Sequence, residues 1–372
     1  MPKKDLKQMY RTRTEGNFPD TIDLLGHAYA KVEDLRYGTN PHQPAAFYRP
    51  ADGKNLVLGA YEILKTGKSG LSQTNIEDMH HAVGILKYMK RPACAVMKHC
   101  NPSGAAIQVN DIPLVEVYQR ARDADAQAAF GSVVVFNTEV DAATAEEIMQ
   151  TIVEGVAAPA FTPEALETLN DFDRFKRNKQ IRIVKLPDFS GLPKYLEDGT
   201  DVFEMKVFDD GSVLLATPYR SRVKGPEDLV PAYCEHAKKG RIDIARKPTA
   251  RELDDLLFAW YVNIHVRSNG CVIARNGQTL AVGTGEQDRV GAVEQAVIKV
   301  SNKYKGAESM EGAVMSSDGF FPFRDAVDAA TKKGVSAIVQ PGGSVNDYDA
   351  ILACNEANAA MVFSMERCFS HH

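Results

Sequence analysis

Short apolar runs alternate with amphipathic stretches through the first half of this chain, a pattern typical of strands linked by helices. The expected strands are the runs at 93–97, 132–136, 180–184 and 212–215. The expected helices are a segment at 113–127 and a second one, capped by Asp141 or Thr144, that ends near 153–155. The opening thirty residues carry mixed charge without this pattern, so we expect them to form an arm.

The second half shows the same alternation. Thr249 and Glu252 form a capping box that predicts the start of a helix with one apolar face. Asn276-Gly277 predicts a tight hairpin between strands at 272–274 and 279–282. Further helices are expected at 288–304, 325–333 and 347–358, and further strands at 312–315, 335–339 and 360–364.

The pattern as a whole predicts an α/β protein with two modules. The expected parts are an arm at 1–30, a first module at 31–220, a proline-containing connector at 221–248 and a second module at 249–372. A diverged duplication would explain the similar order of elements, although no repeat in the sequence itself establishes one.

The composition narrows the class of protein. The 372 residues suffice for two or three modules with their own cores. A net charge of −5 gives no basic field, so nucleic acid is not an expected partner. No apolar run approaches the roughly 18 residues of a membrane span, and the N-terminus lacks the apolar region of a signal peptide. Six dispersed cysteines without a C-x-x-C pair favour a reduced, cytoplasmic protein.

The strongest candidate for chemistry lies where the apolar run 93–97 ends. Lys98 and His99 follow it side by side, and the Asn-Pro-Ser-Gly sequence at 101–104 predicts a turn after them. A histidine exchanges protons near neutral pH, and a lysine neutralises a phosphate or a developing oxyanion. The alternative is a surface lysine beside a loop histidine with a structural hydrogen bond. For the neighbouring Cys100, space filling at the strand end is favoured over a role as nucleophile.

Other polar or glycine-rich segments also follow apolar strands, at 267–270, 318–325 and 341–344. A Gly-Gly-Ser turn before a helix offers backbone N–H groups to an anion, and the aromatic residues at 320–323 suit a stacking wall for a flat ligand. The sequence lacks a phosphate-binding P-loop, a complete dinucleotide fingerprint and the zinc-deaminase pattern. A metal-free, cofactor-assisted transfer reaction on a planar anionic substrate therefore fits what is present.

These segments together resemble one family, the transformylase half of the bifunctional purine biosynthesis protein, known as AICAR transformylase. The resemblance runs from about residue 30 to the C-terminus in the order of the family's motifs. The matching motifs are Arg36-Tyr37-Gly38, Asn40-Pro41-His42-Gln43, Lys98-His99, Asn101-Pro102, Gly104, Phe130-Gly131, Ser268-Asn269, Asp318, Phe320-Phe321-Pro322-Phe323-Arg324-Asp325, Gln340-Pro341-Gly342-Gly343-Ser344, Arg367, Phe369 and His371.

The resemblance implies transfer of a formyl group from 10-formyltetrahydrofolate to the 5-amino group of AICAR. It also implies a fold of duplicated cytidine-deaminase-like modules without the deaminase zinc, and a homodimer whose active sites take residues from both chains. About thirty residues precede Arg36, too few to encode the inosinate cyclohydrolase domain of the family, so we expect no ring closure to inosinate.

The resemblance also assigns roles to individual residues. The implied catalytic residues are Lys98 and His99. The residues implied to bind AICAR are Arg36, Tyr37, Asn269, Phe320, Arg367 and His371. The residues implied to bind the folate are Phe130, Gly131, Glu154, Val290, Pro322, Gly343 and Ser344.

The sequence departs from the family's pattern in two places, with Glu154 where some other members have aspartate and Ala326 where some have asparagine. The final His371-His372 pair matches the family's terminal histidine but is also consistent with a remnant of an added tag. Two alternatives stay open from the residues: a non-catalytic nucleotide-binding or sensor protein that kept the pocket, and an enzyme that uses a modified folate donor.

Overall fold

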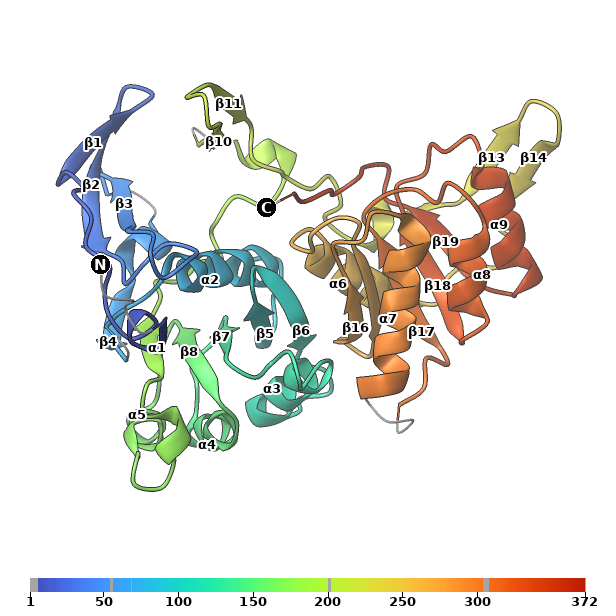
Figure 1. Cartoon of the computed structure of the whole chain (residues 1–372). Helices are drawn as coiled ribbons and strands as arrows, with labels where there is room; N and C mark the ends of the chain where they lie inside the picture. Colours follow the sequence, from blue (N-terminus) through green and yellow to red (C-terminus); the bar gives the residue numbers. More distant parts are fainter. Residues whose placement is uncertain (1–5, 54–55, 68, 200–201, 304–307, 372) are drawn as a thin grey trace.

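The computed structural model describes residues 6–53, 56–67, 69–199, 202–303 and 308–371 (Figure 1). Its centre is one twelve-stranded sheet with the order β12-β19-β18-β17-β15-β16-β6-β5-β7-β8-β9-β4. The strands of this sheet are β4 (Glu62–Lys65), β5 (Ala93–Lys98), β6 (Asn101–Ile107), β7 (Ser132–Phe136), β8 (Val153–Ala158), β9 (Arg182–Lys185), β12 (Val230–Pro231), β15 (Cys271–Arg275), β16 (Gln278–Gly283), β17 (Ala313–Ser317), β18 (Val335–Gln340) and β19 (Ala360–Phe363).

Helices cover both faces of the sheet. The apolar side chains of α2 (Gln73–Leu86) and α6 (Ala250–Asn263) belong to one core cluster that spans both halves. The opposite face carries separate clusters for the two halves. The helices over that face are α3 (Leu114–Asp123), α4 (Ala142–Gln150) and α5 (Pro163–Asn170) in the first half, and α7 (Arg289–Lys303), α8 (Asp325–Thr331) and α9 (Asp347–Glu356) in the second.

The two halves of the sheet have the same topology. In each half a 14-residue helix, α2 or α6, precedes an antiparallel hairpin, and the first hairpin strand also pairs with a third strand in antiparallel fashion. Two further strands then add in parallel. Each of the two helices begins at a capping box, with Ser72 or Thr249 as the N-cap.

Each hairpin's second strand contains a glycine that lets a helix approach. A Cβ on Gly104 of β6 would lie 2.1 Å from the carbonyl oxygen of Ala121 in α3, and one on Gly283 of β16 would lie 2.0 Å from that of Ala292 in α7. Neither position has room for a side chain, so the close packing of helix on hairpin depends on glycine in both halves.

The halves join edge to edge through β6 and β16. Gln278 pairs with Ala106 in antiparallel register, and the Ile107 N–H donates to the Gly277 carbonyl at 2.8 Å. The Thr279 hydroxyl accepts from the Ala105 N–H at 2.9 Å and donates to the Ala105 carbonyl at 3.2 Å. A side chain therefore supplies hydrogen bonds that a longer backbone ladder would otherwise make.

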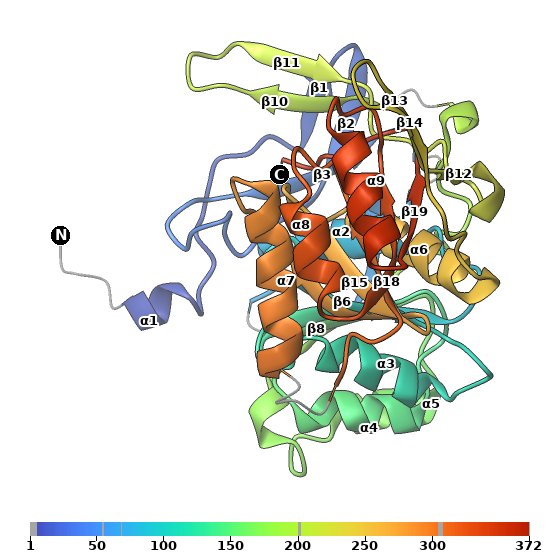
Figure 2. The same cartoon turned by 90° about the vertical axis from the view of Figure 1, so that its right-hand side faces the viewer.

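Smaller elements surround the sheet. A short helix, α1 (Leu6–Met9), precedes a three-stranded sheet of β1 (Thr21–Leu24), β2 (His27–Asp34) and β3 (Ala46–Pro50). The strands β10 (Glu204–Val207) and β11 (Val213–Ala216) form a ribbon that projects from the body (Figures 1 and 2). A second ribbon consists of β13 (Tyr233–His236) and β14 (Gly240–Asp243). Within the described part of the chain, no helix has the length and apolar character to cross a membrane.

Most predicted elements are confirmed within a few residues, including the Asn276-Gly277 hairpin and the helix that starts at Thr249. Two expectations are wrong. Residues 101–104 are not a turn, because Asn101 already pairs with Lys98 and the segment belongs to β6. The helix capped by Asp141 ends at Gln150, and 153–158 is the buried strand β8.

The α/β class is confirmed, whereas the module boundaries stay a prediction. Residues 6–30 of the expected arm include α1, β1 and the start of β2, so this segment has regular structure. The expected connector at 221–248 contains the edge strand β12 and the ribbon β13–β14. Residues 1–5 of the arm, residue 304 of the expected helix 288–304, and His372 lie outside the described residues.

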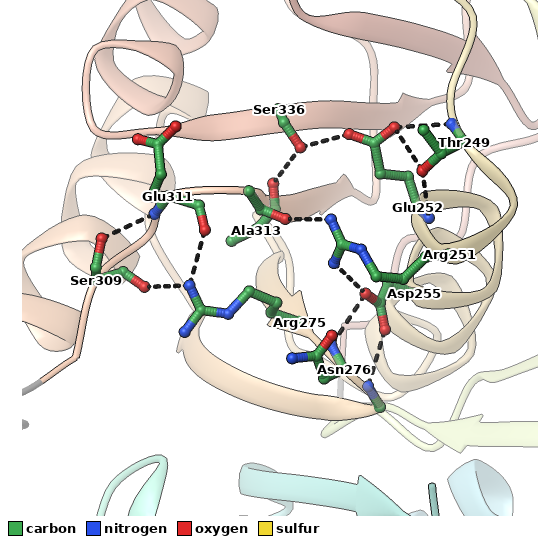
Figure 3. A network of polar contacts seen from close by, with 12 residues as sticks. Thr249, Arg251, Glu252, Asp255, Arg275, Asn276, Ser309, Glu311, Ala313 and Ser336 are labelled. Atoms are coloured by element: carbon green, nitrogen blue, oxygen red, sulfur yellow. Dashed lines mark hydrogen bonds and ion pairs between the residues drawn. The ribbon is translucent and has the colours of Figure 1, made fainter. Parts of the chain in front are cut away.

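A buried carboxylate joins the start of α6 to the sheet (Figure 3). Glu252 is 3% exposed and accepts from both terminal nitrogens of Arg246 at 2.9 Å, from the Thr249 N–H at 2.8 Å and from the Ser336 hydroxyl. Burial raises the pKa of Glu252, but the hydrogen bonds from Arg246, Ser336 and Thr249 outweigh it and lower the pKa to about 2.

Replacing Glu252 should destabilise the fold in a pH-dependent way. Glu252→Gln is expected to lower the free energy of unfolding by about 3 kcal/mol at neutral pH, because Arg246 loses its buried counter-charge. Since the folded pKa is depressed, the contribution is present above about pH 4.5 and is lost as the pH falls toward 2. Denaturant unfolding at several pH values measures this, with the exposed Glu235→Gln as control. Equal effects of the two variants would contradict the assignment.

Candidate active site

Lys98 and His99 lie at the two-residue turn that joins β5 to β6. The turn residues are His99 and Cys100, with φ of 55° and 65°, and Lys98 pairs with Asn101 across it. Such turns favour Asn-Gly because both residues take left-handed backbone conformations. The chain here places a histidine and a cysteine instead, which is the kind of local departure expected at functional sites. His99 is exposed.

The ammonium of Lys98 is held in place by a loop of the neighbouring strand. Its Nζ donates to the Gly131 carbonyl at 2.7 Å, and the Gly131 N–H donates to the Ile152 carbonyl at 2.7 Å. Gly131 has a φ of 69°, and a Cβ there would lie 3.2 Å from the Lys98 nitrogen. Phe130, which precedes Gly131 in the sequence, is 61% exposed.

The environment of the turn sets the ionisation of His99 and Cys100 in opposite ways. Partial burial and the charge of Lys98 lower the pKa of His99 below its usual 6.5, so its imidazole is neutral at pH 7. Burial, Asp78 and Glu77 raise the pKa of the Cys100 thiol to about 12. His99 is thus available as a proton acceptor, and Cys100 is not a thiolate nucleophile at neutral pH.

Asp78, which the sequence analysis did not select, lies beneath this turn. It is 4% exposed, stands on α2, and its Oδ1 accepts from the Cys100 N–H at 2.7 Å. Burial raises its pKa to about 7, although the Cys100 N–H and Lys98 both act to lower it. A repeat in the sequence marks this residue, because Ser72, Asn75 and Asp78 have the same spacing as Thr249, Glu252 and Asp255.

Two buried arginines lie near Glu154. Arg36 and Arg182 are 2% and 1% exposed, and Arg182 lies 3.8 Å from the Glu154 carboxylate. Burial, together with the charge of Arg36, lowers the pKa of Arg182 to about 10. The Arg36 guanidinium stacks on the Tyr37 ring at 4.4 Å. Arg182 was also missed, because an arginine in a buried strand gives no motif.

In the second half, Asp318 lies at the centre of the residues that are predicted to bind AICAR. This fully buried carboxylate pairs with Arg289 and accepts from the Ser268 hydroxyl and, at 2.8 Å, from the Gly270 N–H. The Asn269 amide lies in the same segment and donates to the Glu286 carbonyl at 2.8 Å. Asp318 therefore fixes the backbone on both sides of Asn269.

The C-terminal segment lies against this group. The Ser268 N–H donates to the Ser370 carbonyl at 2.9 Å, and the Cys368 N–H donates to the backbone carbonyl of Asp318 at 3.1 Å. The Phe369 ring stands 4.8 Å from the Arg367 guanidinium and 5.9 Å from the His371 ring. The C-terminal segment therefore lies beside Asn269, and it carries Arg367 and His371. Phe320, which follows Asp318 by two residues, is 46% exposed.

The remaining predicted folate residues form a third group. Asn346 donates to the Pro322 carbonyl at 2.7 Å, and the Asp347 carboxylate accepts from the N–H groups of Gly343 and Ser344 at 2.7 and 2.9 Å. Those N–H groups therefore already have an intramolecular acceptor. Val290, on α7, packs partly buried against the apolar cluster of the second half.

Asn101 connects the reactive turn to the second half. Its side-chain oxygen accepts from the Arg267 N–H at 3.0 Å and from the Thr284 hydroxyl at 2.7 Å. This places the His99-Cys100 turn beside the segment that carries Asn269. Lys98 bonds to Gly131. None of the hydrogen bonds between the described residues joins Lys98 or His99 to the third group, which includes Pro322 and Ser344.

A cavity of about 1,020 Å³ lies elsewhere, at the opposite end of β6. Its lining includes Ile107, Asp255, Asn276 and Gly277 and none of the predicted site residues. In the part of the chain that the structure describes, no cluster of three or more His, Cys, Asp or Glu side chains is arranged to hold a metal ion.

Comparisons with known proteins place this chain among related sequences. The profile of the AICARFT/IMPCHase bienzyme family matches residues 5–299. A "Bifunctional purine biosynthesis protein PurH" of Acetivibrio thermocellus is 39% identical over 358 residues, which are 96% of this chain and 62% of that protein. The proteins of the same name from Oceanobacillus iheyensis and Magnetococcus marinus are 37% and 38% identical over 97% and 96% of this chain.

The chain spans 62% to 63% of the length of these relatives. A match of this extent over nearly the whole of the present sequence goes beyond a shared fold. The chain belongs to the AICARFT/IMPCHase bienzyme family.

Proposed function

We propose that this chain is a formyltransferase of purine biosynthesis, which transfers the formyl group of 10-formyltetrahydrofolate to the 5-amino group of AICAR. The observation that carries the proposal is the turn at the end of β5, where a neutral histidine stands next to a fixed lysine ammonium. The bifunctional relatives named for purine biosynthesis support it. Metal independence, a duplicated cytidine-deaminase-like fold and a cytoplasmic location belong to the same proposal.

The chemistry requires an acid–base pair of this kind. The 5-amino group of AICAR is conjugated with its ring and carboxamide, so it is a weak nucleophile. As its nitrogen bonds to the formyl carbon, His99 takes the amine proton and Lys98 stabilises the charge on the formyl oxygen. The bond from the formyl carbon to N10 then breaks, and N10 receives a proton. A neutral His99 suits the first role, because it already has a free lone pair at pH 7.

The charges around the turn suit a phosphorylated substrate. Arg36 and Arg182 are buried positive charges that both lie near the Glu154 carboxylate. An arginine binds phosphate through two parallel hydrogen bonds. We assign the AICAR phosphate to Arg36 and Tyr37 and its carboxamide to Asn269 and Phe320. Arg367 and His371 complete this set.

The folate is assigned to exposed apolar and backbone groups. Phe130 and Pro322 offer apolar faces to the pterin, and Glu154 accepts from its amino edge. Because Pro322 belongs to the third group, this assignment requires the dimer proposed below to bring that group to Phe130. The N–H groups of Gly343 and Ser344 already donate to Asp347, so they contact the folate only if that carboxylate releases them. Val290 contributes an apolar contact.

Replacing His99 or Lys98 tests the proposal directly. His99→Ala is expected to lower kcat by about 10²–10⁴ while leaving AICAR binding nearly intact. Lys98→Ala should be comparably slow, and the double variant should not be slower by the product of the two effects, because both residues act on one transition state. Initial rates of formyl transfer and calorimetric binding of AICAR measure this. Unchanged kcat in His99→Ala would contradict the assignment of His99 as the proton acceptor.

The same assay separates the alternatives. A sensor protein that kept the pocket would bind AICAR and show no transfer with any donor. Transfer with a modified folate but not with 10-formyltetrahydrofolate would favour the second alternative. Conversion of formylated AICAR to inosinate, measured against a protein-free control, tests separately whether the chain also closes the ring.

A separate prediction concerns the loop that holds the Lys98 ammonium. Gly131→Ala should lower kcat several-fold, because the new Cβ would lie 3.2 Å from Lys98 Nζ. Its matched control is Gly240→Ala, which has a similar φ of 78° and no atom within 4 Å of the new Cβ. Both variants should lose about 1 kcal/mol of folding stability from backbone strain. Equal kcat in the two variants would show that Lys98 does not depend on this loop.

We also propose a homodimer with shared sites. Among the described residues, β10 and β11 pair only with each other and are exposed along both strands, with apolar residues such as Val207, Phe208 and Val213 at 50% to 63% exposure. An isolated hairpin of this kind is marginally stable in water, so a covering surface is expected. Lys206 donates to the His371 carbonyl at 2.9 Å, which connects the ribbon to the candidate site.

Complementation tests the shared site. Lys98→Ala and Asn269→Ala should each be inactive, and a refolded equal mixture should recover about a quarter of wild-type activity, because half of the dimers then hold one intact site. This outcome requires that Lys98 of one chain works with Asn269 of the other, and not with the Asn269 segment that Asn101 brings beside the turn of its own chain. A dimer by sedimentation that shows no recovery would mean that each site belongs to a single chain.

A further inference from the structure

The two hairpins of the sheet are held by the same device. Asp78 is the sixth residue of α2 and accepts from the Cys100 N–H, and Asp255 is the sixth residue of α6 and accepts from the Gly277 N–H at 2.8 Å. Each acceptor is 22 positions before its donor, and each aspartate is 4% exposed. Figure 3 shows the second copy, with Asp255 between Arg251 and the Asn276 turn.

The two turns differ in how well their residues suit the shape. Asn276 and Gly277 have φ of 53° and 69° and are residue types that favour this turn. His99 and Cys100 adopt nearly the same angles without that preference. The residue types of the Asn276-Gly277 turn therefore favour its conformation, whereas the His99-Cys100 turn depends more on hydrogen bonds from other parts of the chain.

Three side-chain hydrogen bonds hold the turn: the Cys100 N–H donates to Asp78 at 2.7 Å, the Asn101 amide donates to the His99 carbonyl at 3.3 Å, and the Cys100 thiol donates to Glu77 at 3.6 Å. The first is the shortest of the three. It fixes the second residue of the turn, and the Asn101 side chain fixes the following residue through Arg267 and Thr284. Without the first bond, His99 could relax toward an ordinary backbone conformation. Its ring would then lose its fixed direction relative to the ammonium of Lys98.

We propose that Asp78 is a positioning residue, whose oxygen holds the His99-Cys100 turn in the left-handed conformation that presents Lys98 and His99 to the substrate. The proposal rests on the proposed formyl transfer. Asp78 touches no reacting atom in this account and acts through the backbone of the turn. Asp255 performs the same structural task at a turn that carries no reactive side chain.

The experiment compares matched variants. Asp78→Ala removes the acceptor, Asp78→Asn keeps an acceptor oxygen, and Asp255→Ala removes the equivalent acceptor at the other turn. For each purified full chain we would measure kcat, both KM values, the thermal midpoint, and hydrogen–deuterium exchange of the peptide spanning residues 98–101. The wild-type rate is measured first.

Asp78→Ala is expected to lower kcat by more than about tenfold with KM values within about threefold, because only the alignment in the transition state is lost. Asp78→Asn should recover most of kcat. Asp255→Ala should keep kcat within about twofold of wild type. A similar fall in kcat for both alanine variants would reduce the role of Asp78 to general stability and overturn the proposal, as would an Asp78→Asn variant as slow as Asp78→Ala.

The exchange measurement separates this proposal from the proposed function. Faster exchange at 98–101 in Asp78→Ala, with protection restored in Asp78→Asn, is expected whatever reaction the chain catalyses. A wild-type chain without formyl transfer would end the proposed function but leave this result readable. Unchanged exchange in Asp78→Ala would overturn the positioning role even in an active enzyme. If Asp78→Ala does not fold, Asp78→Ser, whose hydroxyl is too short to reach Cys100, replaces it under the same criteria.

Discussion

The short antiparallel contact of β6 with β16 makes one sheet out of two half-sheets. It has one paired position, at Gln278 and Ala106, and is strengthened by the Thr279 hydroxyl and by the bond from Ile107 to Gly277. Because the strands run in opposite directions, each half's hairpin turn lies beside the other half. The helices α2 and α6 share one core over this seam, so the halves are also joined by apolar packing.

This arrangement explains where the chemistry lies. The His99-Cys100 turn meets Arg267 and Thr284 of the second half through Asn101, whereas the Asn276-Gly277 turn meets the first half at Ile107. The cavity of about 1,020 Å³ lies at the Asn276-Gly277 turn, and the candidate site lies at the equivalent turn of the first half, His99-Cys100. The His99-Cys100 turn follows Lys98, and both of its residues have positive φ without being glycine or asparagine. The other has an Asn-Gly sequence and ordinary structural bonds.

The sequence analysis succeeded where the signal is local. Asn276-Gly277 and the Thr249 capping box determine their own backbone, and the apolar strand at 132–136 is buried on both faces. It failed at 101–104, because the proline and glycine there suggest a turn while tertiary pairing places them in β6. Gly104 is required by the approach of α3, a contact that no sequence window shows.

The candidate site was found only in part for the same reason. Lys98 and His99 stand out as an adjacent pair, but Asp78 and Arg182 lie within a helix and a buried strand, and only the folded chain brings them to the turn and to Glu154. Asp78 was detectable as one half of a repeated spacing with Asp255. The grouping of Asn269 with the C-terminal residues depends on Asp318, whose burial no motif indicates.

A crystal structure of the chain with AICAR bound is the most direct test of this account. It predicts that the ligand lies at the His99-Cys100 turn, with its 5-amino nitrogen within hydrogen-bond distance of the His99 imidazole and its phosphate beside Arg36. AICAR seated in the cavity beside Asn276 and Gly277, with His99 turned to solvent, would contradict it.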